Sequence, residues 1–353
     1  MSRWQASVEV GTGYELLISA VTIADPSSRS RVAMATMLQR QARALAPGAG
    51  QAFRRIGREP FINLLGWVQA SVRRPSAQAL LAALATADPR EVRLAALGYH
   101  RRAFRSMTPP ATIQAAAAGD RTAIRLMHET ADPEMRHWQA SLRHLLAVTD
   151  GDLQRELVEA LTSWRAAAVE DLEPELERDQ AAGAARAREL LASRDLLDVI
   201  AELVPGIAFN RRIEQSKVVL VPSAIVRPRF AMTDYDATLV IAFPAEVPVA
   251  DAEIVRLARL ADALGDPLRV RVLRELARGA VSTSELARRL GVPRTSLQHH
   301  LSVLTSAGLA AMAVDDATVG LVELRPTALA DLAALSQSVV QVPRVSSRRH
   351  SAE

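Results

Sequence analysis

One short predicted helix in the last third of the sequence carries polar side chains that could read DNA. Leu297, Leu301 and Leu304 recur at helical spacing and must face a core. The opposite face is left to five polar side chains, none of them acidic: Arg294, Thr295, Gln298, His299 and Ser302. Arginine can bind guanine, and glutamine adenine, through two hydrogen bonds each. We therefore take Arg294 and Gln298 as the candidates for base reading, with Thr295 and His299 beside them.

Four neighbouring residues are candidates for contacts to the phosphate backbone or for positioning: Arg288, Arg289, Ser296 and His300. His300 also fits a purely structural role. Between Pro267 and Leu309 there are seven arginines and only two acids, a local balance of +5. Such a balance favours a polyanionic partner, although a solvated basic face or a surface for an acidic protein would have the same composition.

Clear start and stop signals divide this region into three short helices. Asp266 is a good N-cap before Pro267, and Gly279 is placed to end the first helix. Ser282 to Glu285 has the pattern of a capping box, in which each residue satisfies the other's end of the backbone. Residues 291–293 (Gly-Val-Pro) then form a tight turn before the polar helix. Two short helices joined by a glycine-containing turn predict a helix-turn-helix.

These residues resemble the winged-helix repressors of the arsenic-repressor (ArsR-type) family over about residues 252–335. The resemblance is carried by Asp266-Pro267-Leu268-Arg269, Leu286-Ala287, Leu290-Gly291, His300-Leu301, Leu304 and Ala307-Gly308-Leu309. It implies a homodimeric bacterial transcription regulator, with repressor as the favoured sense, whose third helix enters the major groove of double-stranded DNA. It also implies flanking dimer helices at residues 251–264 and 327–340.

The sequence departs from the family pattern at the wing and before the His-Leu pair. Residues 310–314 contain no basic side chain and the expected hairpin tip is Asp315-Asp316, whereas family wings often carry Arg or Lys. His299 stands where Arg is often found. The metal-sensing form of the family is disfavoured, because residues 284–290 lack cysteine and residues 327–340 lack histidine.

The overall composition narrows the function classes. The 353 residues contain no cysteine and a single lysine, Lys217, and the formal net charge is +4. Disulfides and thiolate metal sites are thereby excluded. No signal-peptide pattern and no long apolar run is present, so we expect a cytoplasmic protein without membrane contact. We find no paired nucleophile and base, no phosphate loop and no zinc signature, and expect no catalytic residue, no cofactor and no metal.

The remainder of the chain predicts a mainly α protein with a helical N-terminal domain, a small β-hairpin and a C-terminal winged helix-turn-helix. We expect a regulatory or dimerisation domain at 1–245, the DNA-binding domain at 250–340 and a disordered basic tail at 341–353. Short strands are expected near 7–10, at 217–223 and at 237–243, the last two paired as a hairpin. An effector of unknown identity would act through the N-terminal domain.

Two features of the N-terminal region leave alternatives open. Aromatic residues such as Trp67, Trp164, Phe53 and Phe61 could line an effector pocket, but ordinary core packing is favoured. The stretch at 8–13 (VEVGTG) has the look of a ligand-binding turn, as in a methyltransferase-type enzyme that uses a winged helix only for dimerisation. A plain turn is favoured here, because no acidic residue follows at the required spacing.

Overall fold

The computed structural model divides the chain into two compact units. Unit 1 comprises Met1–Val204, Phe209–Val247 and Asp315–Val319; unit 2 comprises Pro205–Ala208, Pro248–Val314 and Gly320–Glu353. The structure describes residues 4–24, 33–45, 47–102, 108–130, 136–204, 207–209, 216–226, 230–245, 252–315, 318–325 and 327–340. The tail at 341–353 and Asp316 of the expected hairpin tip lie outside these ranges. Within them, no helix combines the length and apolar character needed to cross a bilayer.

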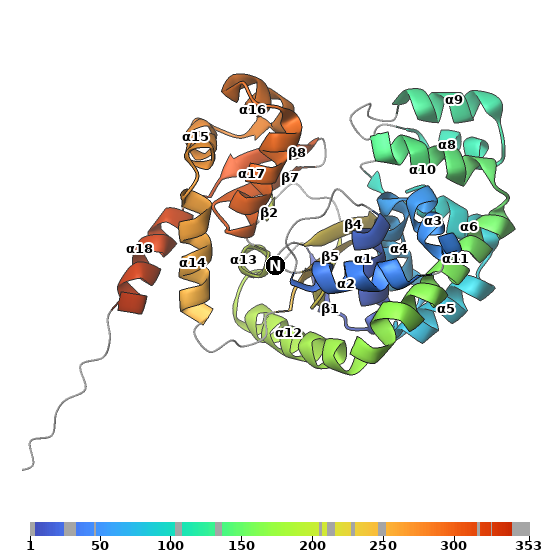
Figure 1. The fold of residues 1–353 in the computed structure, drawn as a ribbon, viewed down its shortest axis with the longest axis horizontal. Helices are drawn as coiled ribbons and strands as arrows, with labels where there is room; N and C mark the ends of the chain where they lie inside the picture. Colours follow the sequence, from blue (N-terminus) through green and yellow to red (C-terminus); the bar gives the residue numbers. More distant parts are fainter. Residues whose placement is uncertain are drawn as a thin grey trace, which may run out of the picture. The chain divides into compact units, whose positions relative to one another are not determined.

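Unit 1 is built from helices packed around one small sheet (Figure 1). From the N-terminus, its described helices are α1 (Thr12–Ala24), α2 (Ala33–Ala44), α3 (Pro47–Ile56), α4 (Arg58–Ser71), α5 (Ala77–Thr86), α6 (Pro89–Ala96), α8 (Pro110–Ala117) and α9 (Arg121–Thr130). Then follow α10 (Arg136–Ala147), α11 (Asp150–Trp164), a π-helical turn η2 (Arg165–Val169), a 3-10 turn η3 (Glu170–Leu172), α12 (Glu173–Ser193) and α13 (Leu196–Leu203). Its strands are β1 (Gln5–Val8), β3 (Lys217–Ser223), β4 (Ala231–Tyr235) and β5 (Thr238–Pro244).

The sheet of unit 1 has the order β1-β3-β5-β4. β3 pairs with both β1 and β5 in parallel, and β4 pairs with β5 antiparallel. Our prediction that residues 217–223 and 237–243 form a hairpin is therefore wrong: they are parallel neighbours, and the hairpin is β4–β5. Both β3 and β5 are buried along almost their whole length, which is the usual environment of parallel strands.

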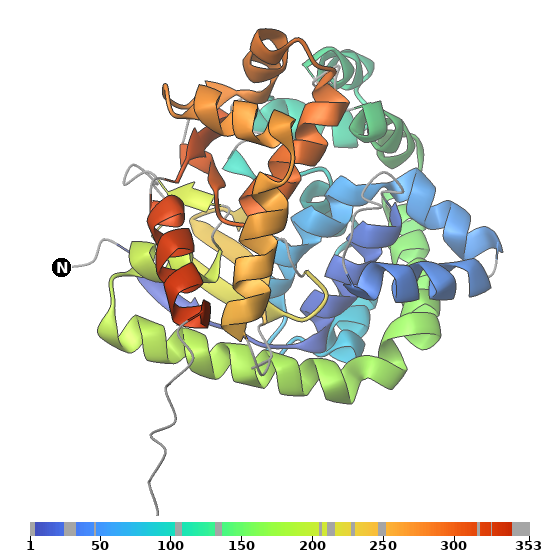
Figure 2. The ribbon, with the colours of Figure 1, turned by 60° about the vertical axis from the view of Figure 1, so that its left-hand side comes forward.

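Helices cover the sheet at close range. α12 packs against β1 and β3 and lies beside the strands in both views (Figure 1 and Figure 2), while α4 packs against β4 and β5. α12 approaches closely at Gly183, where an added Cβ would lie 2.7 Å from the Cβ of Pro222. A glycine in the middle of this helix is thus explained by packing, although glycine lowers helix propensity.

Four aromatic residues of unit 1, Phe53, Phe61, Trp67 and Trp164, belong to its core. The rings of Phe53 and Phe61 lie 5.5 Å apart, and those of Phe53 and Trp164 lie 6.3 Å apart in an edge-on arrangement. Trp67 and Trp164 are at most 1% exposed. The indole N–H of Trp164 donates to the hydroxyl of Ser19 at 2.8 Å, so its polar atom is satisfied inside the core. The packing interpretation holds for these residues.

The glycine-containing turn after β1 is filled by the protein itself. The side-chain oxygen of Gln180 accepts from the amide of Gly11 at 2.9 Å, and its amide nitrogen donates to the Gly11 carbonyl at 3.2 Å. An added Cβ on Gly11 or on Gly13 would lie 2.5 Å from the carbonyl oxygen of Pro75. The glycines therefore allow close backbone packing, and Gln180 takes up the hydrogen-bonding groups that a ligand at Gly11 would need.

A buried carboxylate, Glu15, ties the start of α1 to the end of β3. It accepts from the hydroxyl of Ser223 at 2.6 Å and from the amide of Ala224 at 2.7 Å, with longer bonds from Ile225 and Gln180 at 3.4 Å. Burial raises the pKa of Glu15 to about 7, and the hydrogen bonds from Ser223, Ala224, Ile225 and Gln180 act in the opposite direction. The net effect is that ionised Glu15 is disfavoured in the folded unit relative to the unfolded chain.

The elements of unit 2 are α14 (Ala252–Leu264), α15 (Pro267–Leu276), β6 (Val281–Ser282), α16 (Thr283–Leu290), α17 (Arg294–Ser306), β7 (Ala310–Asp315), β8 (Thr318–Leu324) and α18 (Thr327–Val340). The end of β7 at residue 315 and the start of β8 at residues 318–319 fall in the segment assigned to unit 1. Its sheet has the order β2-β7-β8-β6, in which β2 (Ile207–Phe209) comes from the chain before β3. We did not predict β2. The mainly α architecture with a helical N-terminal part and a C-terminal winged helix-turn-helix is confirmed.

Replacing Glu15 with glutamine tests the buried carboxylate. A raised folded-state pKa means that the contribution of Glu15 to stability is full below about pH 4.5 and is lost as the pH rises to about 7. The free energy of unfolding of wild type minus that of Glu15→Gln should therefore fall by about 3 kcal/mol over this range. All four tryptophans precede residue 205, so tryptophan fluorescence during urea unfolding reports unit 1.

The exposed Glu159 on α11 provides the control for this experiment. The difference between wild type and Glu159→Gln should show no such fall between pH 4.5 and pH 7. A pH-independent difference for Glu15→Gln would contradict the raised pKa of Glu15.

Candidate nucleic-acid interface

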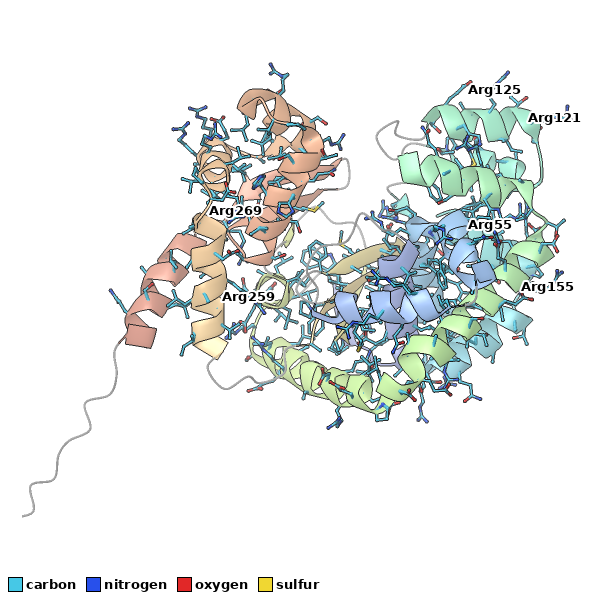
Figure 3. The ribbon with its side chains drawn as sticks, in the orientation of Figure 1. Arg55, Arg121, Arg125, Arg155, Arg259 and Arg269 are labelled. Atoms are coloured by element: carbon cyan, nitrogen blue, oxygen red, sulfur yellow. The ribbon has the colours of Figure 1, made fainter. Side chains whose placement is uncertain are left out.

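The first helix of the helix-turn-helix region is fixed by hydrogen bonds at its start. The carboxylate of Asp266 accepts from the amides of Leu268 at 2.7 Å and Arg269 at 3.2 Å, as the N-cap prediction requires. The buried guanidinium of Arg269 donates to the carbonyls of Ala263 at 2.7 Å and Asp262 at 2.6 Å, close to the point where α14 ends (Figure 3). Arg269 therefore satisfies carbonyls at the end of α14 and is a structural arginine.

The second helix, α16, starts at half of the predicted capping box. The hydroxyl of Ser282 accepts from the amide of Glu285 at 3.2 Å. The Glu285 carboxylate accepts from Arg288 at 2.7 and 2.8 Å and from Arg289 at 2.8 Å, instead of turning back to Ser282. Hydrogen bonds from Arg288 and then Arg289 hold the pKa of Glu285 at about 2. Gly291 ends α16 in the left-handed conformation, with φ 65°.

The third helix, α17, buries one side and exposes the other. Leu297, Leu301 and Leu304 are at most 7% exposed and belong to the core of unit 2. Thr295 and Gln298 are exposed on the opposite side. Four further candidates on α17 are partly exposed: Arg294, Ser296, His299 and Ser302. The structure thus brings these six polar residues to the accessible part of one helix.

His300 differs from the other candidates on α17. Its imidazole is 14% exposed, and its Nδ1 lies 3.7 Å from a carboxylate oxygen of Asp266. Burial would raise the pKa of Asp266, but hydrogen bonds from the amides of Arg269 and Leu268 outweigh it, and the charges of His300 and Arg269 also lower that pKa. His300 thus connects α17 to the N-cap of α15, which corresponds to the structural role considered from the sequence.

A second row of basic side chains lies on α15. Arg271 and Arg274 are exposed, and no hydrogen bond or ion pair joins either one to another described residue. Arg278 lies just beyond the end of α15 and pairs with Glu275 at 2.8 Å. These arginines are not among the candidates named from the sequence, although the spacing of three residues between Arg271 and Arg274 predicts a shared helix face.

Comparison with known proteins assigns this region. Residues 264–313 match the family model of a helix-turn-helix domain. The chain is also 45% identical over 53 residues to the HTH-type transcriptional regulator CmtR of Mycobacterium bovis and of two strains of Mycobacterium tuberculosis. That alignment covers 15% of this chain and 45% of each relative, so the chain spans less than half the length of the curated relatives it matches. No solved structure matches the chain.

The described residues contain no group of three or more His, Cys, Asp and Glu side chains that could hold a metal ion. The histidines with described ion pairs each face a single carboxylate: His100 faces Asp236, His144 faces Glu156 and His300 faces Asp266. Each of these contacts joins one histidine to one carboxylate.

Truncation of Leu297 tests whether the leucine side of α17 holds the helix in place. Leu297 is fully buried, so Leu297→Ala should lower the free energy of unfolding of unit 2 by about 2–5 kcal/mol. Because unit 2 contains no tryptophan, the measurement is hydrogen exchange of the amides of α15, α16 and α17. Gln298→Ala, at the exposed neighbouring position, should leave their protection unchanged. Equal protection in the two variants would show that Leu297 does not hold α17 in the core.

Proposed function

We propose that the protein is a sequence-specific transcriptional regulator that binds double-stranded DNA through α17. The observation that carries the proposal is the division of this helix into a leucine side inside the core and an accessible polar side without acids. The match to a helix-turn-helix domain family and the likeness to HTH-type transcriptional regulators support it. A helix of this kind lies in the major groove, with its N-terminal residues at the base edges.

The proposed contacts follow the position of each side chain on α17. Arg294 begins the helix, where a guanidinium can reach guanine, and Gln298 lies one turn later, where an amide can reach adenine. Thr295 and His299 would contact neighbouring bases. The remaining candidates would serve backbone contacts or positioning: Arg288, Arg289, Ser296, His300 and Ser302.

Contacts of Arg288 and Arg289 to phosphate would require a change of partner. Both guanidinium groups bind Glu285 in the free protein. A DNA phosphate would have to replace the Glu285 carboxylate, or share the arginines with it. Glu285 therefore lowers the gain from these two contacts.

We further propose a homodimer assembled through α14 and α18, with a repressor role as the favoured sense. α14 packs against α18, and Ile254 and Val255 on α14 remain 50% and 39% exposed. Apolar side chains at such exposure support a contact with a second copy. Two-fold symmetry would place two α17 helices in half-sites roughly 34–36 Å apart.

Unit 1 would modulate DNA binding in this proposal. It contains its own sheet and aromatic core, so it can hold a defined conformation separate from the DNA-binding unit. An effector that binds it can change DNA affinity only if it binds two conformations of the protein with different affinity.

Base reading by α17 is tested by selecting bound fragments from random DNA and measuring affinities for the selected site. Gln298→Ala and Arg294→Ala should each cost about 1–3 kcal/mol and relax the preference at one base position. Arg121→Ala, at an exposed arginine of α9 in unit 1, is the control and should bind like wild type. Equal, weak binding of wild type to every duplex would contradict sequence-specific regulation.

Backbone contact by α16 is tested by the salt dependence of affinity. Arg288→Ala should weaken binding to all sequences alike and reduce the slope of log affinity against log salt by about 0.9. Glu285→Gln should tighten binding, because it frees the arginines and removes a negative charge. An unchanged slope in both Arg288→Ala and Arg289→Ala would exclude these phosphate contacts.

One observation favours a second candidate function. β7 and β8 carry no basic side chain and β7 ends at Asp315, so these two strands offer no cation for DNA. A winged-helix module that binds an acidic protein through its basic helices would show the same combination of basic helices and wing strands without basic side chains. The absence of DNA binding by wild type in the selection experiment would favour this alternative.

A further inference from the structure

A hollow on the surface of unit 1 is lined by basic side chains from two helices. Its volume is about 400 Å³, and it is bordered by Gln51, Arg54 and Arg55 of α3 and by Ala140 and His144 of α10. None of the described lining residues is acidic. The hollow is shallow and open to solvent.

Glu156 of α11 holds two of the lining side chains in position. One of its oxygens accepts from Arg55 at 2.5 and 3.0 Å, and the other lies 2.5 Å from Nε2 of His144. Glu156 and His144 are 16% and 18% exposed, whereas Arg55 is 48% exposed. Arg55 is therefore oriented at one edge of its guanidinium, while part of the group remains accessible.

The charge of the hollow is not balanced by this carboxylate. Arg54 and Arg55 carry two positive charges and Glu156 carries one negative charge. Arg54 is exposed, and among the described residues it has no hydrogen-bond or ion-pair partner. A positively charged hollow with an unengaged guanidinium is complementary to an anion, because arginine binds carboxylate and phosphate through parallel hydrogen bonds.

We propose that this hollow binds a small organic anion that carries carboxylate or phosphate groups. Arg54 and the accessible edge of Arg55 bind the anionic group, Gln51 donates a further hydrogen bond, and Ala140 contacts the apolar part of the ligand. Glu156 is a positioning residue that fixes Arg55 and His144 before the ligand arrives. A ligand bound in this way joins α3 to α10.

The inference names the chemical class of the effector that the proposed function leaves open. It depends on that function only for the role of the ligand as an effector, and not for the existence of the site. Binding of the anion by the full chain without DNA is therefore measured first, and the effect on DNA affinity second. If the protein binds the anion but no DNA, the proposed anion site stands and the proposed regulatory function fails.

The probes are citrate, which presents three carboxylates, and inorganic phosphate, each compared with sodium chloride of equal ionic strength. Isothermal titration and the shift in melting temperature of the full chain are measured at millimolar concentrations. We expect saturable binding of at least one probe to wild type. Arg54→Gln should weaken that binding by at least about tenfold, because it removes a charged donor without disturbing the bonds of Glu156.

Matched variants separate the site from a general effect of charge. Arg121→Gln removes an exposed arginine on α9, outside the lining, and should bind the anion like wild type (Figure 3). Arg55→Gln should weaken binding at least as much as Arg54→Gln. Equal affinity of wild type and Arg54→Gln, or no binding of either probe to folded wild type, would overturn the proposal.

Discussion

Burial of three leucines along one side of α17 is the constraint on which the candidate interface depends. Leu297, Leu301 and Leu304 are held in the core of unit 2, so the helix cannot rotate without exposing them to water. The same constraint fixes which polar residues are accessible and turns His300 toward Asp266. The buried leucines therefore determine which residues of α17 are accessible. A candidate base-reading residue is identified by its position relative to these leucines as well as by its own hydrogen-bonding groups.

The distribution of charge in this region matters more than its sum. The balance of +5 between Pro267 and Leu309 includes Arg269, whose guanidinium is used by backbone carbonyls, and three arginines that are paired with Glu275 or Glu285. A phosphate must compete with those carboxylates. The pairs of Arg288 and Arg289 with Glu285 are partly exposed, and such pairs are weak, so their exchange for a phosphate would cost little, whereas Glu275 is buried. Each retained carboxylate would still repel a DNA backbone. A count of arginines therefore does not show which guanidinium groups are available to a phosphate.

Local signals in the sequence were sufficient for the helix-turn-helix region, because its caps and turns lie within a few residues of the groups they satisfy. Asp266 and Ser282 accept the amide bonds expected of N-caps, and Gly291 has the expected left-handed backbone. The capping box was only half right, since Glu285 meets two nearby arginines that compete with the backbone. The contacts of the helix-turn-helix region could be predicted where the two partners are close in sequence.

Pairings between distant segments could not be predicted in the same way. β3 and β5 look like hairpin partners because both are rich in β-branched residues, yet the less apolar β4 forms the antiparallel pair. Gln180 fills the turn at Gly11 although it lies 169 residues away in the sequence, and no residue near Gly11 predicts this contact. β2 is too short to show a period, although it joins the sheet of unit 2.

In the proposed function, the path of the chain at β2 is one route by which unit 1 would act on unit 2. The chain leaves unit 1 after α13, contributes β2 to the sheet of unit 2, and returns to unit 1 at β3. β2 neighbours β7, and β7 follows directly on α17. If unit 1 modulates DNA binding as proposed, a change in α13 or β3 would reach β2 through the chain at residues 204–206 or 210–216. An effector would then alter α17 only if it bound two arrangements of these elements with different affinity.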